Sequence, residues 1–162
     1  ICEQCPWQNH CVAYNSGDPG AFPVKGTKLV VSKEIIGIGL ILNTNQEVLI
    51  DQRLNEVSMG GMWEFPGGKQ EKEESIKMTI SRELREELGI EVKVGIKLVE
   101  FDHSYTHRKF HFVVHLCEYI SGTPKPLASQ EFLWVKLDQL EDFPFPAANA
   151  RIISSLKSHL ES

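Results

Sequence analysis

The chain has 162 residues, of which 41% are hydrophobic and 24% are charged, as expected for a soluble globular protein with one well-packed domain and some additional chain. Its formal net charge of −5 argues against strong autonomous binding to a nucleic-acid phosphate backbone. It contains no apolar run of membrane-spanning length and no secretory signal, so we expect a cytoplasmic protein that does not contact a membrane.

Three cysteines lie close together at the start of the chain, with the spacing C-x2-C-x5-C. They are Cys2, Cys5 and Cys11, whereas Cys117 lies far away in a predicted strand. Three nearby thiols can be a fragment of a metal site, the remnant of a disulfide framework or a chance grouping. In a reducing compartment a metal or iron–sulfur site is favoured over a disulfide. Because the sequence begins at Ile1 without a methionine, we expect that it is a piece of a longer chain.

The rest of the chain divides into a linker over residues 13–33 and a domain over residues 34–162. Glycine, proline and serine are frequent at the front of the linker, which is typical of connecting segments. The hydrophobic patterns that follow predict strands over 34–42, 47–53, 92–100, 109–119 and 132–137, with a short extended piece over 63–65. A last helix is predicted over 148–160, with its apolar residues Ile152, Ile153, Leu156 and Leu160 inward. We therefore expect an α+β domain with a mixed sheet between helices.

A second helix is predicted in the middle of the domain, directly after the glycine turn Pro66-Gly67-Gly68. Its apolar residues recur every fourth position, which gives one buried stripe. These residues are Ile76, Ile80, Leu84 and Leu88. Ser75 is a candidate N-cap, and Gly89 can adopt the left-handed conformation that ends many helices.

Three glutamates near the end of this helix, Glu83, Glu86 and Glu87, are spaced i, i+3 and i+4 and so share a face. Their charges repel one another and oppose the helix dipole, and a hard divalent cation such as Mg²⁺ would reverse that penalty. The alternative is a solvated helix face on which Arg82 and Arg85 neutralise the glutamates.

The stretch from Gly68 to Ile90 favours the metal interpretation, because it resembles the Nudix box G-x5-E-x7-R-E-U-x-E-E-x-G-U, where U is apolar. Every fixed position matches, namely Gly68, Glu74, Arg82, Glu83, Leu84, Glu86, Glu87, Gly89 and Ile90. The resemblance implies the Nudix fold, an α/β/α sandwich. It also implies a catalytic site in which Mg²⁺ or Mn²⁺ is bound by Glu83, Glu86, Glu87 and the carbonyl of Gly67. Arg82 would hold the glutamates in place.

Within that superfamily the chain resembles the MutT-like hydrolases of 8-oxo-dGTP, which release 8-oxo-dGMP and pyrophosphate. The resemblance rests on the turn Glu64-Phe65-Pro66-Gly67-Gly68-Lys69, on Arg53, and on the run from Phe143 to Asn149. It implies that Phe65, Gly68, Lys69 and Arg53 contact the nucleotide and that Asn149 pairs with the base, for which an amide offers both a donor and an acceptor. Asn149 could instead cap the last helix.

The segment from Phe101 to His107 resembles a different family, the MutY-type adenine DNA glycosylases, in which a similar loop reads 8-oxoguanine in DNA. The residues in that role would be Tyr105, Thr106 and His107. The three clustered cysteines, Cys2, Cys5 and Cys11, also resemble the last ligands of that family's [4Fe–4S] loop. A complete cluster would require a longer parent chain, in which a glycosylase domain would bring this domain to DNA containing 8-oxoguanine. Otherwise the segment is an exposed hairpin loop.

One position departs from the MutT-like pattern. These hydrolases commonly carry a further glutamate six residues before a tryptophan of the late strand, and counting back from Trp134 gives Ala128. Loss of this carboxylate removes a candidate metal ligand or base, so we expect slowed hydrolysis.

Overall fold

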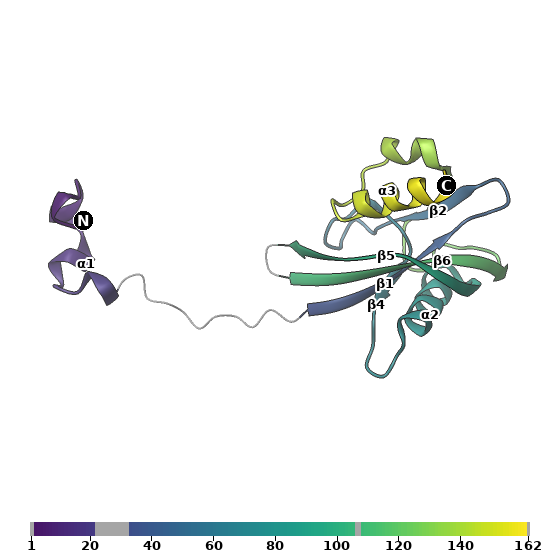
Figure 1. The fold of residues 1–162 in the computed structure, drawn as a ribbon, viewed down its shortest axis with the longest axis horizontal. Helices are drawn as coiled ribbons and strands as arrows, with labels where there is room; N and C mark the ends of the chain where they lie inside the picture. The colour runs from purple at the N-terminus through teal and green to yellow at the C-terminus, as the bar shows by residue number, and fades with distance from the viewer. Residues whose placement is uncertain (1, 22–32, 106–107, 162) are drawn as a thin grey trace. The chain divides into compact units, whose positions relative to one another are not determined.

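A computed structural model describes residues 2–21, 33–105 and 108–161 (Figure 1). The chain divides into two compact units, Ile1–Val31 and Ser32–Ser162. The first unit consists of short helices: η1 (Cys2–Gln4), η2 (Gln8–His10), α1 (Val12–Asn15) and η3 (Pro19–Ala21). Its three cysteines are free thiols, two of them exposed and one partly buried. None of the helices in the described segments is long and apolar enough to cross a membrane.

The second unit contains two sheets. The larger has the strand order β4-β1-β6-β5, in which β1 (Lys33–Ile41) runs parallel to β6 (Arg108–Ser121). The edge strand β4 (Gly67–Lys69) pairs antiparallel with β1, and the other edge strand, β5 (Glu91–Tyr105), pairs antiparallel with β6. The smaller is antiparallel, with the order β3-β2-β7: β3 (Trp63–Glu64), β2 (Glu47–Gln52) and β7 (Phe132–Lys136). The helix α2 (Ile76–Leu88) lies on one side of the sheets. The short helix η4 (Leu137–Asp142) and α3 (Asn149–Leu160) lie on the other (Figure 1). The predicted α+β class with a mixed sheet between helices is confirmed.

Two apolar clusters hold these layers together. Ile80, Leu84 and Leu88 of α2 are fully buried in one cluster, and Ile152 and Leu156 of α3 are fully buried in the other. The strand β2 contributes to both, because successive side chains point to opposite faces. Its two even-numbered apolar residues, Val48 and Ile50, join the α3 cluster, while the intervening Leu49 joins the α2 cluster. By the same alternation Asp51 faces the α2 side.

Both ends of α2 agree with the prediction from the sequence. The hydroxyl of Ser75 accepts a hydrogen bond of 3.3 Å from the backbone N–H of Met78, which satisfies a donor of the first turn. Gly89 has φ of 68°, the left-handed conformation that a glycine adopts without a steric penalty. The helix is therefore fixed at both ends, and so are the positions of its glutamates.

Three details of the prediction were wrong. The segment Phe101–Tyr105, expected as a loop, continues strand β5 and pairs with β6. The segment Gly67–Lys69 is not only a turn, because it pairs antiparallel with β1 as strand β4. Glycine permits this close approach, since a Cβ atom on Gly67 would lie 2.1 Å from the carbonyl oxygen of Gly37. Leu160, expected to point inward, is 38% exposed because α3 ends there and extends past the core.

Candidate active site

A cleft of about 660 Å³ opens among β1, the β3–β4 segment, the end of the β5–β6 hairpin and the start of α3. It collects side chains predicted as substrate contacts from four distant parts of the sequence: Arg53, Phe65, Gly68, Lys69, Tyr105 and Asn149. Thr106 and His107, which were predicted to read a base together with Tyr105, lie outside the described residues. The cleft also contains residues that the sequence did not indicate, among them Glu34, Met59 and Arg108.

Asn149 lies at the end of the cleft formed by α3 and is 7% exposed. It is the first residue of the helix, whereas Ala148 occupies the N-cap position, and no side chain caps the helix. The capping role considered for Asn149 is therefore wrong. Within the described part of the chain no hydrogen bond engages its side-chain amide, so both its donor and its acceptor remain available to a ligand.

Aromatic rings line the cleft near Asn149. Phe65 stacks on Phe145 with ring centroids 5.4 Å apart and is almost completely buried. Tyr105 contacts Phe110 edge to face, with centroids 5.7 Å apart. Burial raises the pKa of Tyr105, so its hydroxyl stays protonated at neutral pH. Planar apolar walls with a few polar groups suit a flat heteroaromatic ring.

The opposite end of the cleft meets α2 through Gly67 and Gly68. The backbone N–H of Gly67 donates a hydrogen bond of 3.0 Å to a carboxylate oxygen of Glu87. Gly68 lies so close to Glu83 that a Cβ atom there would be 2.3 Å from the carboxyl carbon. The two box glutamates therefore lie directly against the backbone that lines the cleft.

Two of the cations that line the cleft, Arg53 and Lys69, are each near a carboxylate. Arg53 forms an ion pair of 2.5 Å with Glu64, in which both side chains are mostly buried. Lys69 is 3.5 Å from Glu34, and its side chain is 62% exposed. Lys69 can thus reach an incoming anion at little cost, whereas Arg53 would have to share its guanidinium with Glu64.

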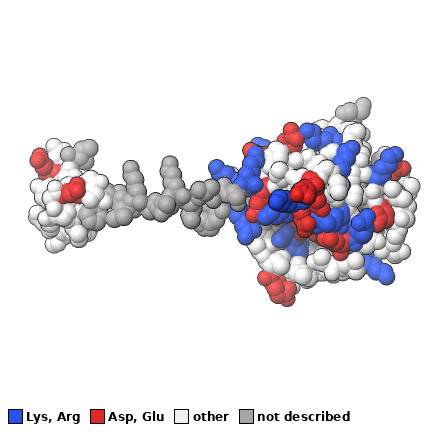
Figure 2. Space-filling model, turned by 90° about the horizontal axis from the view of Figure 1, so that it is seen from below, with Lys and Arg blue, Asp and Glu red and all other residues white. Residues whose placement is uncertain are grey.

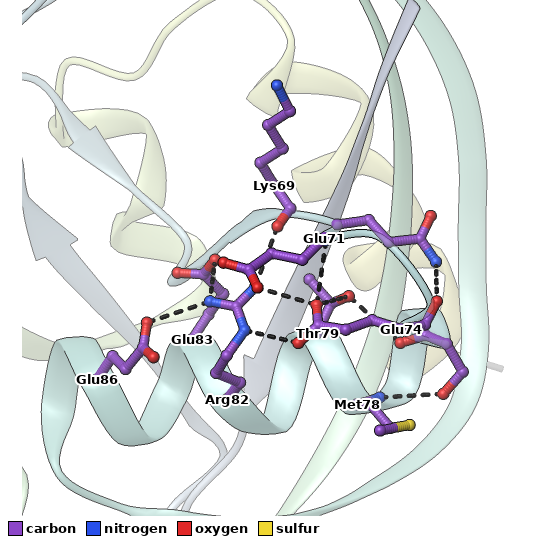
Figure 3. A network of polar contacts seen from close by, with 10 residues as sticks. Lys69, Glu71, Glu74, Met78, Thr79, Arg82, Glu83 and Glu86 are labelled. Carbon is purple, nitrogen blue, oxygen red and sulfur yellow. Dashed lines mark hydrogen bonds and ion pairs between the residues drawn. The ribbon is translucent and has the colours of Figure 1, made fainter.

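Arg82 is the centre of a network of ion pairs on α2, which we call the arginine cluster (Figure 3). Its guanidinium contacts Glu74 at 2.7 Å, Glu83 at 2.9 Å and Glu86 at 3.1 Å, and donates to the carbonyl of Lys69 at 3.1 Å. The hydrogen bond from Arg82 lowers the pKa of Glu74 to about 2, and bonds from the Glu71 N–H and the Thr79 hydroxyl contribute further. Arg82 thus contacts two of the three glutamates that it was predicted to hold, Glu83 and Glu86, and contacts Glu74 in addition, whereas no ion pair joins it to Glu87 in the described structure.

Two other carboxylates have no such cation as a partner, and we call them the carboxylate pair: Asp51, which is buried, and Glu87, which is partly buried. Burial, together with the negative charge of Asp51, raises the pKa of Glu87 to about 9. Burial likewise raises the pKa of Asp51 to about 7. Asp51 was not among the site residues predicted from the sequence. The available signal was an acidic residue at an inward position directly after the apolar run of β2.

The donor set fits a hard divalent cation, because it consists of carboxylate oxygens, one of which, Oδ1 of Asp51, is buried without a hydrogen-bond partner. In the segments that the structure describes, no three acidic, histidine or cysteine side chains already converge on one metal position. Glu83 and Glu86 instead point to Arg82. A cation would have to draw Glu83 toward Glu87, and both already touch the same glycine turn.

The face that carries α2 is not dominated by charge of one sign. Acidic and basic side chains alternate over it in Figure 2, which views the molecule from the side where α2 lies in Figure 1. This agrees with the net charge in giving no electrostatic footprint for a nucleic-acid backbone on that face.

Comparison with known proteins gives the class of this chain. Residues 37–155 match the family model of the NUDIX domain. The chain is 33% identical over 122 residues to the 8-oxo-dGTP diphosphatase of Escherichia coli K12, covering 75% of this chain and 95% of that protein. It is 29% identical over 123 residues to the CTP pyrophosphohydrolase of the same organism, covering 76% and 91%. The MutT protein of Methanosarcina mazei Go1 superposes with a TM-score of 0.75 at 25% identity, covering 83% of this chain and all of that one. The chain belongs to the NUDIX family.

Proposed function

We propose that this chain is a metal-dependent pyrophosphohydrolase that converts oxidised purine nucleoside triphosphates, above all 8-oxo-dGTP, to the monophosphate and pyrophosphate. The observation that carries the proposal is the single cleft, which joins the glycine turn against Glu83 and Glu87 at one end to the free amide of Asn149 at the other. The similarity to diphosphatases named for 8-oxo-dGTP supports the choice of nucleotide.

At the phosphate end, Glu83, Glu86, Glu87 and the carbonyl of Gly67 are the groups that would hold Mg²⁺ or Mn²⁺. The bound cation would neutralise phosphate charge and lower the pKa of the attacking water. Arg82 fixes the side chains of Glu83 and Glu86 through its ion pairs and so acts as a positioning residue.

Two cations assist with the remaining phosphate charge. The exposed ammonium group of Lys69 can turn from Glu34 to a phosphate oxygen. Arg53 remains near Glu64 and presents part of its guanidinium to the nucleotide.

At the base end, the amide of Asn149 donates to and accepts from the base edge. A guanine oxidised at C8 has gained a carbonyl oxygen and an N7–H, so beside the O6 acceptor its edge offers an N7–H donor where guanine offers a second acceptor, N7. An amide can satisfy both at once. Phe65 and Tyr105 flank the same part of the cleft and would contact the ring faces.

Pyrophosphate release with Mg²⁺ from 8-oxo-dGTP, dGTP and CTP, each as sole substrate, tests the proposal. We expect the highest kcat/KM for 8-oxo-dGTP and a loss of turnover in Glu83→Gln. Glu118→Gln, a matched control at an exposed carboxylate far from α2 in sequence, should keep wild-type turnover. A preference for CTP would keep the hydrolase and refute the base assignment, and a folded wild-type chain that hydrolyses none of the three would refute both.

A second candidate is recognition of 8-oxoguanine in DNA by a MutY-type adenine glycosylase of which this chain would be a part. It is supported by the cysteines Cys2, Cys5 and Cys11 and by Tyr105, which lies at the end of β5 and lines the cleft. Binding of fluorescent duplexes containing 8-oxoguanine or guanine opposite adenine tests it. Equal affinity for the two duplexes, or binding that Tyr105→Ala leaves unchanged, would refute recognition by this domain alone.

A further inference from the structure

Asp51 is a buried carboxylate on the α2 side that no sequence pattern assigned to the site. It is 2% exposed, and its Oδ1 atom has no hydrogen-bond partner in the described structure. An uncompensated buried carboxylate is costly, since leaving such a group unsatisfied sacrifices its hydration. A residue of this kind in an otherwise apolar strand requires an explanation.

The strand β2 directs Asp51 toward the box helix. Leu49, two residues earlier, packs in the cluster formed with α2, and strand alternation places Asp51 on the same face. On that side its charge acts on Glu87. Across the sheet Asp51 pairs in register with Glu64, and antiparallel partners project to the same face. Asp51 therefore lies among the carboxylates of the phosphate end.

A second buried polar group lies beside Asp51. The hydroxyl of Ser129 acts on the Asp51 carboxyl as a hydrogen-bond donor and lowers its pKa, although no hydrogen bond of normal geometry joins the two side chains. One weak neutral donor leaves most of the acceptor capacity of a buried carboxylate unused, so Asp51 can still bind a ligand. Ser129 directly follows Ala128, so Asp51 brings a carboxylate next to the segment where the MutT-like pattern led us to expect one.

We propose that Asp51 is a further metal-holding residue, which binds the divalent cation together with Glu87. The inference rests on the proposed function, because the cation is the one that hydrolysis requires. The proposal explains why Asp51 is buried. A bound divalent cation would supply the positive charge that neither Arg53 nor Arg82 provides from within hydrogen-bond distance of Asp51.

The test uses Mn²⁺ alone, without nucleotide. Free Mn²⁺ is titrated by electron paramagnetic resonance, and the melting temperature is measured in EDTA and in Mn²⁺. The variants are Asp51→Asn, the smaller neutral Asp51→Ser, and Asp102→Asn as an exposed control. We expect Asp51→Asn to weaken Mn²⁺ binding by about 10-fold or more, the scale on which groups around a metal act. Its melting temperature in EDTA should equal or exceed that of the wild type, while the rise on adding Mn²⁺ shrinks.

Three outcomes would overturn the inference. Wild-type Mn²⁺ affinity in both Asp51 variants would show that the carboxylate does not touch the cation. Unfolding or a lower melting temperature in EDTA for both variants would show that Asp51 is structural. If the wild-type chain itself binds no Mn²⁺, the proposed function fails first, which separates its failure from that of the inference.

Discussion

The arginine cluster and the carboxylate pair share helix α2, to which the segment before the helix adds Glu74 and strand β2 adds Asp51, yet Glu74 and the carboxylate pair are in opposite electrostatic states. Around Arg82, a hydrogen-bonded guanidinium lowers the pKa of Glu74 to about 2, whereas burial raises the pKa of Glu83 despite its contact with Arg82. In the carboxylate pair, burial raises the pKa of Glu87 to about 9 and that of Asp51 to about 7. One group is complete as folded, and the other lacks a cation.

This difference distinguishes carboxylates that support the shape of the site from carboxylates that bind a ligand. A carboxylate that is already neutralised by a fixed arginine contributes to the shape of the site. A buried carboxylate without a charged partner destabilises the fold, and its presence is explained by the binding of a ligand. Glu83 belongs to both groups, because it contacts Arg82 and lies against Gly68. Through Glu83, the binding of a cation and the ion pairs of the arginine cluster would affect each other.

The largest expected effect is from Glu87→Gln. Turnover of the oxidised nucleotide should fall by more than about 100-fold, beyond the range typical of groups that only support a metal. The unfolding free energy without metal should stay nearly the same at neutral pH, because the variant replaces a carboxyl group that burial keeps protonated and the amide oxygen can still accept the bond from Gly67. Glu74→Gln is the matched comparison and should lower stability by loosening Arg82. Equal loss of stability in the two variants would contradict the distinction between the groups.

Arg82→Lys should reduce kcat by about 10–100-fold with a smaller change in KM, since the lysine cannot span three carboxylates with a planar fork. Pyrophosphate release at saturating Mg²⁺ measures it. Arg85→Lys is the control, because the ion pair that Arg85 forms within the described residues is with Glu91, which lies outside the site. If Arg82→Lys retains wild-type kcat, positioning of Glu83 and Glu86 by Arg82 does not matter.

Asn149→Ala tests the base end of the cleft independently of the arginine cluster and the carboxylate pair. Loss of hydrogen bonds worth about 1.5 kcal/mol should lower kcat/KM for 8-oxo-dGTP about tenfold while leaving dGTP nearly unchanged. Mn²⁺ affinity and stability should not change greatly, because the amide makes no hydrogen bond within the described structure and does not cap α3. An equal fall for both nucleotides would show that Asn149 does not read the oxidised edge.

The sequence predicted the helix of the box, its caps and most strands, because local periodicity and glycine placement determine them. Asn149 and Phe65 were identified by resemblance, and the fold alone placed them in one cleft. Asp51 could not be assigned in this way. A single acidic residue after an apolar run acquires its meaning only when strand alternation, burial and the nearby Glu87 are known together. At position 128 the sequence shows only that the expected carboxylate is absent. The fold places the carboxylate of Asp51 beside the next residue, Ser129.

The smallest expected effect is a pH dependence of stability that should appear only without metal. A carboxyl group with a raised pKa in the folded state binds its proton more tightly than in the unfolded chain. Stability from this source is therefore complete below the ordinary pKa near 4.5 and is lost as the pH rises toward about 9 for Glu87 and about 7 for Asp51. Glu74 has the opposite sign, but its contribution changes only between about pH 2 and 4.5.

In EDTA the melting temperature should therefore fall by several degrees between pH 6 and pH 9, given roughly 2–8 °C per kcal/mol for domains near this size. Saturating Mg²⁺ should reduce the slope, because the cation favours the ionised carboxylates that high pH produces. Glu87→Gln should also reduce it, whereas Glu118→Gln, at an exposed carboxylate, should not. A melting temperature that rises over this interval in EDTA would mean that the carboxylate pair is not held protonated by burial, and the contrast with the arginine cluster would then disappear.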